Sequence, residues 1–194
     1  MLLIPLYILR IEKKNEYIES DWKRRIDMKN IVLIGMPGSG KSTVGVVLAK
    51  ILGMGFIDSD LIIQEEEHRL LTEIIKEEGV NGFIAIENQV NQHINVKDRV
   101  IATGGSAIYG NEAMEHFREN DIVVYLQWSY EEIESRLGDL KERGVVLKPG
   151  QDLKALYEER CPLYEKYAHI IINCEGLSIT ELACAIEKRV SGFV

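Results

Sequence analysis

The chain has 194 residues, of which 46% are hydrophobic and 28% charged, and its net charge is −8. These values are typical of a single folded domain, and the negative charge argues against a nucleic-acid backbone as partner. No segment reaches the ~20 apolar residues of a membrane-spanning helix. The three cysteines are scattered without metal-binding spacing, which is typical of a reducing compartment. We therefore expect a cytoplasmic protein with no membrane or nucleic-acid partner.

Residues 1–29 differ in charge from the rest of the chain. They contain seven basic and five acidic residues, a net charge of +2, so the remaining residues carry −10. We predict an N-terminal extension over residues 1–29 and a single domain over residues 30–194. The sequence leaves open whether translation starts near Met28 or whether the extension docks on the domain or on another chain.

A glycine-rich loop joins the first predicted strand to the first predicted helix. The strand covers residues 31–34, the loop covers residues 35–43, and the helix follows to residue 50. The loop has the form G-x-x-x-x-G-K-[ST], in which backbone N–H groups and the helix N-terminus bind phosphates. The lysine of such a loop reaches the terminal phosphates and the serine hydroxyl ligates Mg²⁺. The sequence therefore predicts a nucleoside triphosphate site made by Gly38, Ser39, Gly40, Lys41, Ser42 and Thr43.

Further strands and helices alternate along the chain. Short apolar runs predict strands, of which the one at residues 122–126 is β-branched and continuous, as in a parallel strand that is covered on both faces. Helical periodicity lies between these runs, and Pro162 is expected to interrupt or kink the helix that begins near Leu153. This order favours an α/β fold with a parallel sheet. The expected strands are at residues 56–57, 100–102, 122–126 and 170–172, and the expected helices at residues 61–98, 131–137, 153–157 and 178–190.

Four short motifs, in this order and spacing, resemble those of the shikimate kinases. They are the phosphate loop, the Asp58-x-Asp60 pair, the V-I-A-T-G-G run at residues 100–105, and the R-x-P-L-Y run at residues 160–164. The resemblance extends over roughly residues 29–190. It implies a three-layer P-loop fold of the nucleoside-monophosphate-kinase type, with a five-stranded parallel sheet and a mobile lid at about residues 138–151. It also implies ATP and Mg²⁺ as cofactors, a small-molecule hydroxyl acceptor such as shikimate, and a monomer.

The resemblance also implies roles for individual residues. Asp58 would act near Mg²⁺ with Ser42, and Asp60 would contact the acceptor hydroxyl and take its proton. The spacing of these two aspartates at an extended strand end would place both carboxylates on one side. Arg143 of the lid would close over the phosphates, and Arg136 would stack on adenine. The acceptor would be bound by Asp60, Glu87, Gly104, Gly105 and Arg160.

Three positions depart from the family pattern. The family has an arginine after the phenylalanine of its G-E-x-x-F-R-x-x-E run, and this chain has Ile84 there, while the glutamate that would orient the arginine remains as Glu87. The third glycine of the acceptor loop is Ser106, and the lid sequence R-P-L-L is replaced by residues 143–146 without its proline. An apolar side chain cannot hold a carboxylate. Either another basic residue compensates, or Glu87 binds a hydroxyl or an amine of the acceptor.

We therefore predict a kinase that phosphorylates a hydroxyl group, with shikimate as the first candidate acceptor. The departure at Ile84 leaves another polyol or hydroxy acid as an alternative acceptor. It also leaves a nucleotide-binding regulator whose acceptor site has decayed. A nucleoside monophosphate kinase would need a basic grip on the acceptor phosphate, for which residues 61–98 offer only Arg69 and Lys76.

Overall fold

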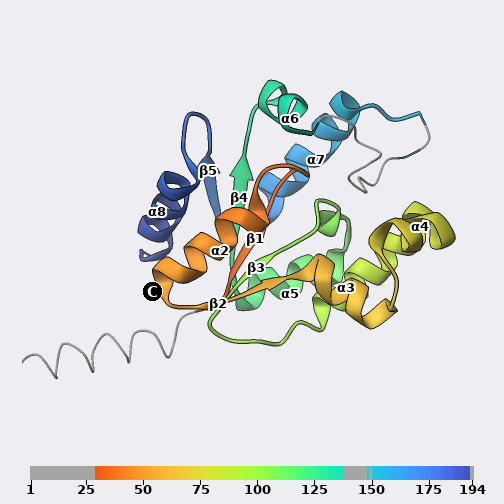
Figure 1. Ribbon diagram of the computed structural model, residues 1–194, viewed down its shortest axis with the longest axis horizontal. Coiled ribbons are helices and arrows are strands. Elements are labelled where there is room, and N and C mark those ends of the chain that lie inside the picture. The colour runs from red at the N-terminus through yellow and green to blue at the C-terminus, as the bar shows by residue number, and fades with distance from the viewer. Residues whose placement is uncertain (1–28, 138–147, 149, 193–194) are drawn as a thin grey trace, which may run out of the picture.

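A five-stranded parallel sheet forms the centre of the molecule (Figure 1). In this computed structural model, the described residues are 29–137, 148 and 150–192. The strand order is β2-β3-β1-β4-β5, and all four pairings are parallel. The predicted parallel α/β sheet is therefore confirmed. The strands are β1 (Ile31–Ile34), β2 (Gly55–Asp58), β3 (Arg99–Ala102), β4 (Ile122–Gln127) and β5 (Ile170–Asn173).

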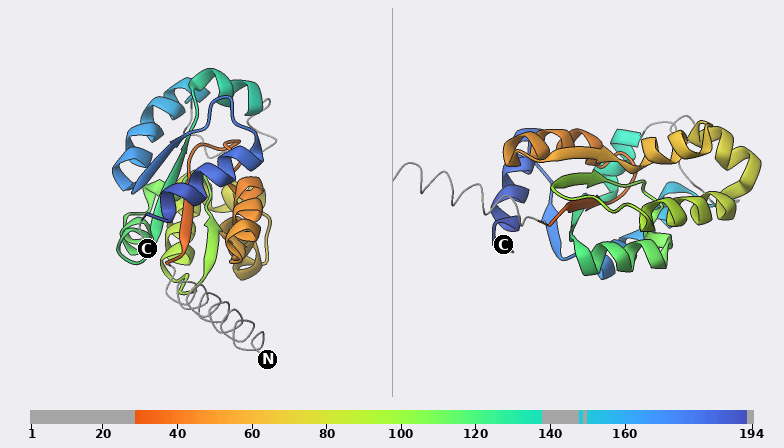
Figure 2. Two further views of the ribbon diagram at one scale, coloured as in Figure 1. Left: turned by 90° about the vertical axis from the view of Figure 1, so that its left-hand side faces the viewer. Right: turned by 90° about the horizontal axis from the view of Figure 1, so that it is seen from below.

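Helices cover both faces of the sheet and complete the three layers. Helices α2 and α8 lie against one face, while α5 and α7 lie against the other (Figure 2). The helices are α2 (Lys41–Leu52), α3 (Ser59–Glu67), α4 (Leu71–Gln92), the 3-10 helix η1 (Ala107–Tyr109), α5 (Asn111–Asn120), α6 (Tyr130–Leu137), α7 (Leu153–Tyr167) and α8 (Ile179–Val190). None of these helices is long and apolar enough to cross a membrane.

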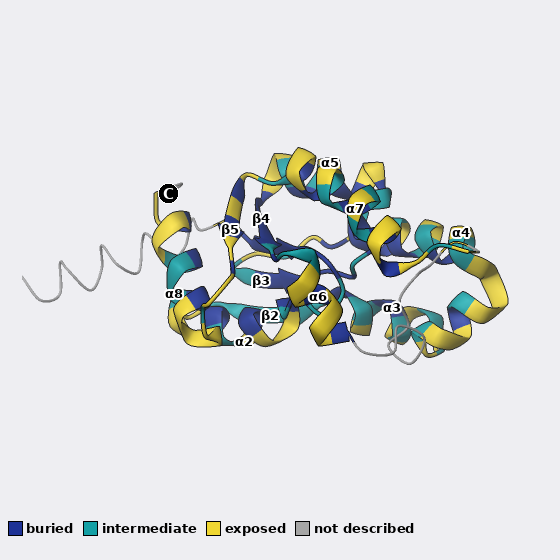
Figure 3. Ribbon diagram, turned by 90° about the horizontal axis from the view of Figure 1, so that it is seen from above, coloured by how far each residue is buried: buried dark blue, intermediate teal, exposed yellow. Residues whose placement is uncertain are grey.

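The core lies on both sides of β1, the middle strand. All four residues of β1 are fully buried, as are Val123 and Val124 beside them on β4. Figure 3 draws β4 largely in the dark blue of buried residues. Every side chain of a central parallel strand packs under a helix, which explains why these strands appear in the sequence as unbroken apolar runs. Burying apolar surface of this kind stabilises a fold by about 25 cal/mol per Å². The rigid strands hold the loops at their carboxyl ends in place.

Helices α3 and α4 extend beyond the sheet and carry part of the site. Helix α4 is bent at Gly79, whose backbone (φ 69°, ψ 178°) is not helical. A second, smaller apolar cluster joins the two helices through Ile63, Ile74, Phe83 and Val90. This cluster fixes the part of α4 that faces the carboxyl end of β3.

Two local predictions were wrong. Asp60 does not lie on an extended strand end, because α3 begins directly after β2 and places Asp60 in its first turn. The interruption expected at Pro162 is absent, because Pro162 lies inside α7 and the helix continues across it from Leu153 to Tyr167. Packing of Leu156, Tyr164 and Tyr167 in the core offsets the loss of the proline N–H.

Candidate active site

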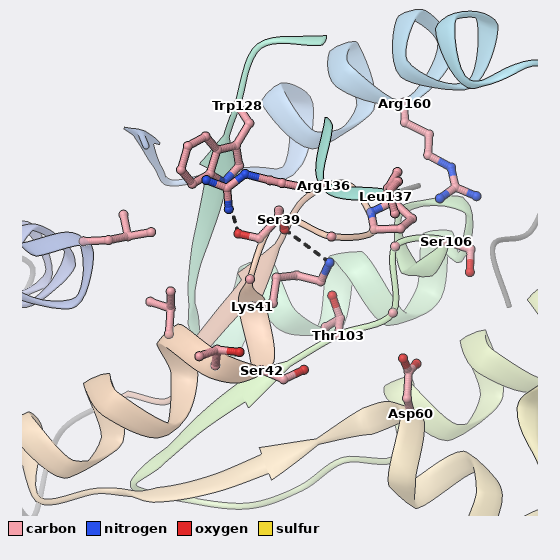
Figure 4. A pocket seen from close by; sticks show the side chains of 18 of the residues that line it. Ser39, Lys41, Ser42, Asp60, Thr103, Ser106, Trp128, Arg136, Leu137 and Arg160 are labelled. Atoms are coloured by element: carbon pink, nitrogen blue, oxygen red, sulfur yellow. Dashed lines mark hydrogen bonds between the residues drawn. The ribbon is translucent and has the colours of Figure 1, made fainter. Parts of the chain in front are cut away.

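A cavity of about 860 Å³ lies at the carboxyl ends of the strands (Figure 4). Ligands of open α/β sheets bind at this edge. Figure 4 shows Lys41 in the middle, Trp128 and Arg136 on one side, and Asp60 and Arg160 on the other. The cavity lining includes Pro37 to Val44, Asp60, Leu71, Phe83, Thr103 to Ser106, Trp128, Arg136, Leu137, Arg160, Leu177 to Ile179 and Leu182.

The phosphate loop connects β1 to α2. Gly38 and Gly40 have φ of 76° and 90°, a region that favours glycine. The loop therefore closes back on the N-terminus of α2, where backbone N–H groups and the helix dipole attract anions.

Lys41 is held inside this loop. Its ammonium group donates hydrogen bonds of 2.8 and 3.0 Å to the carbonyl oxygens of Gly35 and Met36. Burial lowers the pKa of Lys41 to about 8, although the negative charge of Asp60 acts in the opposite direction. These two carbonyl oxygens carry only partial negative charge. A phosphate group carries full negative charge and would therefore be a stronger partner for the Lys41 ammonium.

Ser42 and Asp58 form a small oxygen cluster beside the loop. The Ser42 hydroxyl donates a 2.6 Å hydrogen bond to Oδ2 of Asp58. The other oxygen of Asp58 accepts the backbone N–H of Asp60 and caps α3. Among the described residues there is no group of three or more His, Cys, Asp and Glu that could hold a metal. The oxygens of Ser42 and Asp58 are nevertheless enough for a Mg²⁺ site. Mg²⁺ usually binds only one or two protein oxygens, and waters and phosphate oxygens complete its coordination.

Asp60 is the acidic side chain of the cavity lining. Burial raises its pKa to about 6, and the neighbouring charge of Asp58 adds to the rise, while Lys41 opposes it. A carboxylate with this pKa is mostly ionised at pH 7 and still a better proton acceptor than an exposed aspartate. The side chain can therefore act as a general base within the cavity.

The acceptor loop follows β3 and is fastened at several points. The Thr103 hydroxyl bonds to the Leu33 carbonyl at 3.0 Å, and the Tyr164 hydroxyl bonds to the Gly105 carbonyl at 2.6 Å. A Cβ at Gly105 would lie 2.8 Å from Pro37 and 3.1 Å from an Arg160 nitrogen. Glycine fits here because Pro37 of the phosphate loop and Arg160 of α7 occupy the space that a side chain would need.

Arg160 projects from α7 toward this loop. It is 1% exposed, and its Nε donates a 3.3 Å hydrogen bond to the Tyr109 hydroxyl. The Tyr109 hydroxyl also bonds to Glu159 at 2.7 Å, which orients the ring and the guanidinium together. Figure 4 shows the guanidinium reaching toward Ser106.

Glu87 lies behind the acceptor loop. It is 1% exposed on α4, and its pKa is raised to about 8 by burial. A Cβ built at Gly104 would overlap its Oε1 and lie 2.8 Å from Oδ1 of Asp60. Ile84, one turn earlier, packs against the small apolar cluster of α3 and α4 rather than lining the cavity.

Trp128 and Arg136 form the opposite wall. The Arg136 guanidinium lies 3.6 Å from the centre of the Trp128 ring, and its Nε bonds to Glu132 one turn away. The Trp128 Nε1–H donates a 3.0 Å hydrogen bond to the Ser39 carbonyl. A stacked guanidinium presents its second face to the cavity, where a planar base can lie.

Most of the predicted site residues meet in this one cavity. The phosphate loop, Asp60, Gly104, Gly105, Arg136 and Arg160 line it, Asp58 contacts it through Ser42, and Glu87 abuts Gly104. Arg143 lies outside the described residues. Sequence reasoning missed Trp128, Tyr109 and Tyr164. Tyr164 belongs to the R-x-P-L-Y run, and Trp128 directly follows a strand at the ligand-binding edge, so both carried a signal.

Known proteins resemble this chain over most of its length. The family model described as shikimate kinase matches residues 37–191. A shikimate kinase of Thermodesulfovibrio yellowstonii is 38% identical over 165 residues, which cover 84% of this chain and 95% of the relative. The structure of a shikimate kinase from Acinetobacter baumannii in complex with shikimate superposes with a TM-score of 0.79 at 34% identity, covering 86% of this chain and 95% of that one. The Aquifex aeolicus shikimate kinase has a TM-score of 0.74 at 32% identity, covering 84% and 97%.

Proposed function

Because the chain belongs to the shikimate kinase family and is an ATP-dependent phosphotransferase with a hydroxyl acceptor, we propose that it converts ATP and shikimate to ADP and 3-phosphoshikimate. The convergence of Lys41, Asp60 and Arg160 on one cavity supports this proposal most strongly. These residues supply the three things the reaction needs: a cation at the phosphate loop, a base, and a cation for an acceptor carboxylate.

On the donor side, the loop amides and Lys41 bind the β- and γ-phosphates of ATP. The ammonium of Lys41 exchanges its two carbonyl partners for phosphate oxygens as the nucleotide enters. Ser42 and Asp58 would hold Mg²⁺, which neutralises phosphate charge when bound. Phosphoryl transfer depends on positioning and charge stabilisation, so these groups account for much of the rate.

On the acceptor side, Asp60 orients the hydroxyl and accepts its proton. The hydroxyl oxygen forms a bond to the γ-phosphorus, the bond from the γ-phosphorus to the bridging oxygen breaks, and ADP leaves with that electron pair. Arg160 pairs with the acceptor carboxylate, a task suited to its planar fork of N–H donors. Gly104 and Gly105 let the acceptor approach the backbone of the loop.

Arg143 and the other features expected from the sequence belong to the same proposal. A lid at about residues 138–151 would bring Arg143 over the phosphates and exclude water from the transfer. We also propose that residues 30–194 form the catalytic domain, that residues 1–29 are an extension, and that the enzyme works as a monomer. Three free cysteines, at positions 161, 174 and 184, support a cytoplasmic location.

The proposal is tested by incubating the purified chain with ATP, Mg²⁺ and shikimate. ADP should form only when shikimate is present, and mass spectrometry should detect a product heavier by one phosphoryl group. ATP binding without any acceptor-dependent ADP would instead favour a nucleotide-binding regulator.

A further inference from the structure

Tyr109 connects the acceptor loop to two neighbouring residues of α7. It is the last residue of η1, which follows the acceptor loop directly. Its hydroxyl accepts a 3.3 Å hydrogen bond from Nε of Arg160 and donates a 2.7 Å hydrogen bond to Oε1 of Glu159. Arg160 lines the cavity, whereas Tyr109 and Glu159 lie behind it. An effect of Tyr109 or Glu159 on a bound acceptor therefore passes through Arg160.

The two hydrogen bonds of the Tyr109 hydroxyl run in one direction. A hydroxyl has a single proton, and since that proton goes to Glu159, the oxygen presents lone pairs to the N–H of Arg160. Hydrogen bonds joined in this way polarise one another, so the Glu159 carboxylate strengthens the bond between the tyrosine and the guanidinium. The Arg160 guanidinium carbon also lies 5.2 Å from the centre of the Tyr109 ring.

Glu159 is held in place by the segment that precedes α7. Nζ of Lys148 donates a 2.8 Å hydrogen bond to its Oε1, and Nε2 of Gln151 donates a 2.8 Å hydrogen bond to its Oε2. The Gln151 side chain in turn accepts the backbone N–H of Lys148 at 3.1 Å. The hydrogen bonds from Lys148 and from Tyr109 hold the pKa of Glu159 below its ordinary value, so this carboxylate is ionised at neutral pH. Donors at both oxygens fix its orientation.

The backbone around Tyr109 is fixed as well. The Tyr109 N–H donates a 2.9 Å hydrogen bond to the Ser106 carbonyl, which closes the turn of η1. On the other side, the Tyr164 hydroxyl bonds to the Gly105 carbonyl at 2.6 Å. The acceptor loop and η1 therefore meet α7 at two places, and Arg160 lies between these two contacts in the sequence of α7.

The orientation of Arg160 matters because the acceptor side has few cations. At the position where the family has an arginine, Ile84 packs in the apolar cluster of α3 and α4. In the described part of the cavity lining, the other cations are Lys41 at the phosphate loop and Arg136 on the opposite wall (Figure 4). A guanidinium binds a carboxylate through two parallel N–H groups only when its plane is correctly turned. Residues that fix this plane therefore influence which acceptors bind.

We propose that Tyr109 and Glu159 are positioning residues that hold Arg160 in the orientation that binds the acceptor carboxylate. They thereby make the enzyme select acceptors that carry a carboxylate. This inference rests on the proposed function, since it takes shikimate as the acceptor. Neither residue touches the reacting atoms, so their loss should raise KM for the acceptor and leave kcat little changed.

Shikimate and its methyl ester test the inference as a matched pair. The ester keeps the ring hydroxyls and lacks the carboxylate charge. Tyr109→Phe removes only the hydroxyl, and Glu159→Ala removes the carboxylate that orients it. Each change should raise KM for shikimate about three- to tenfold, the usual effect of losing one hydrogen bond. In both variants, kcat/KM for the methyl ester should stay close to the wild-type value. Calorimetry with ADP and Mg²⁺ present makes the same comparison for binding alone.

A double variant and two controls separate positioning from a general effect on the fold. Because both residues act through one contact with Arg160, Tyr109→Phe with Glu159→Ala should lose no more selectivity than the weaker single variant. Glu158→Ala changes the exposed neighbour of Glu159 on α7 and should keep the wild-type selectivity. Tyr130→Phe removes another tyrosine hydroxyl that bonds to a glutamate, at 2.5 Å on α6, and should keep it too. Melting temperatures verify that every variant is folded.

The outcomes distinguish the two proposals. Equal losses with shikimate and with its methyl ester, a loss in kcat alone, or no loss at all would overturn the inference and leave the proposed function standing. Additive losses in the double variant would contradict a joint action through Arg160. A wild-type chain that forms no ADP with shikimate would overturn the proposed function and the inference with it.

Discussion

The Ser42 hydroxyl donates a 2.6 Å hydrogen bond to the carboxylate of Asp58, sixteen positions later in the chain. The bond joins the start of α2 to the end of β2, so the end of the phosphate loop and the end of β2 present their oxygens together. Mg²⁺ prefers such hard oxygen ligands, so Ser42 and Asp58 are the residues that would hold it.

This geometry predicts the effect of Asp58→Asn. The amide oxygen can still accept the N–H of Asp60 and cap α3, but it carries no charge for the metal. The concentration of Mg²⁺ for half-maximal activity should rise about tenfold, while the melting temperature changes little. A titration of activity with MgCl₂ at saturating ATP measures the first effect. An unchanged requirement for Mg²⁺ would remove Asp58 from the metal site.

The raised pKa of Asp60 predicts how kcat/KM depends on pH on the acidic side of neutrality. Since only the ionised carboxylate can accept the acceptor's proton, kcat/KM should rise with pH through the pKa of Asp60, about 6, and then level off. Asp60→Asn should lower kcat by roughly 10²–10⁴-fold, the usual contribution of a general base, and should abolish this limb. Measuring kcat/KM of the wild type and of Asp60→Asn from pH 5 to pH 8 tests this prediction. An acidic limb that persists in the variant would mean that another group titrates.

The raised pKa of the buried Glu87 carboxyl predicts that the free energy of unfolding depends on pH. Its pKa is about 8 in the folded chain and 4.5 in an ordinary environment, so between these pH values the folded state binds a proton that the unfolded state has lost. The free energy of unfolding should therefore fall as pH rises from 4.5 to 8, by an amount on the order of a few kcal/mol.

Glu87→Gln should remove most of this fall, and the variant should be more stable than the wild type above pH 8. Urea unfolding at pH 5, 7 and 8.5 measures both chains under equal conditions. Parallel pH dependences in the two chains would show that Glu87 has a partner in solution.

Gly104 separates the proposed base from Glu87. In Gly104→Ala, the new methyl group would collide with Oε1 of Glu87 and lie 2.8 Å from Oδ1 of Asp60. Displacement of Asp60 should reduce kcat/KM by about 100-fold, since misplacement of a catalytic group by about 1 Å has effects of this size. Gly192→Ala is the matched control, because its Cβ would meet only a backbone oxygen at 3.6 Å. Equal activity of the two variants would contradict the proposed crowding.

Arg136 stacks on Trp128, and we propose that its other face binds adenine. Arg136→Ala should raise KM for ATP about 2- to 5-fold with a small change in kcat, because an exposed cation–π contact contributes roughly 0.5–1 kcal/mol. Arg189→Ala, on the exposed end of α8, should leave KM for ATP unchanged. A rise in kcat/KM for GTP relative to ATP in Arg136→Ala would also indicate contact with the base. No change in either nucleotide would place adenine elsewhere.

The fold could be predicted because its signals are local. The apolar runs at residues 31–34 and 122–126 predict buried parallel strands, and the glycine pattern of residues 35–43 dictates a turn into a helix. The pairing of Asp58 with Ser42 also follows once the order of the strands is known. A helix that begins directly after Asp58 was missed, because the cap forms between Asp58 and the N–H of Asp60 over only two residues.

The acceptor side could not be predicted in the same way. The position of Glu87 behind Gly104 depends on the bend of α4 at Gly79 and on the packing of Phe83. No local pattern encodes the burial of Glu87 against Gly104, since that burial depends on elements far apart in the sequence packing together. The stacking of Arg136 on Trp128 likewise joins residues from the end of β4 and from α6.

Transfer of label from [γ-³²P]ATP to the acceptor tests the central claim most directly. The wild-type chain with Mg²⁺ should move the label to shikimate. Asp60→Asn should bind ATP with similar affinity and transfer almost none. Label that appears only as free phosphate, at the same rate in both chains, would contradict the account of a hydroxyl kinase built around Lys41 and Asp60.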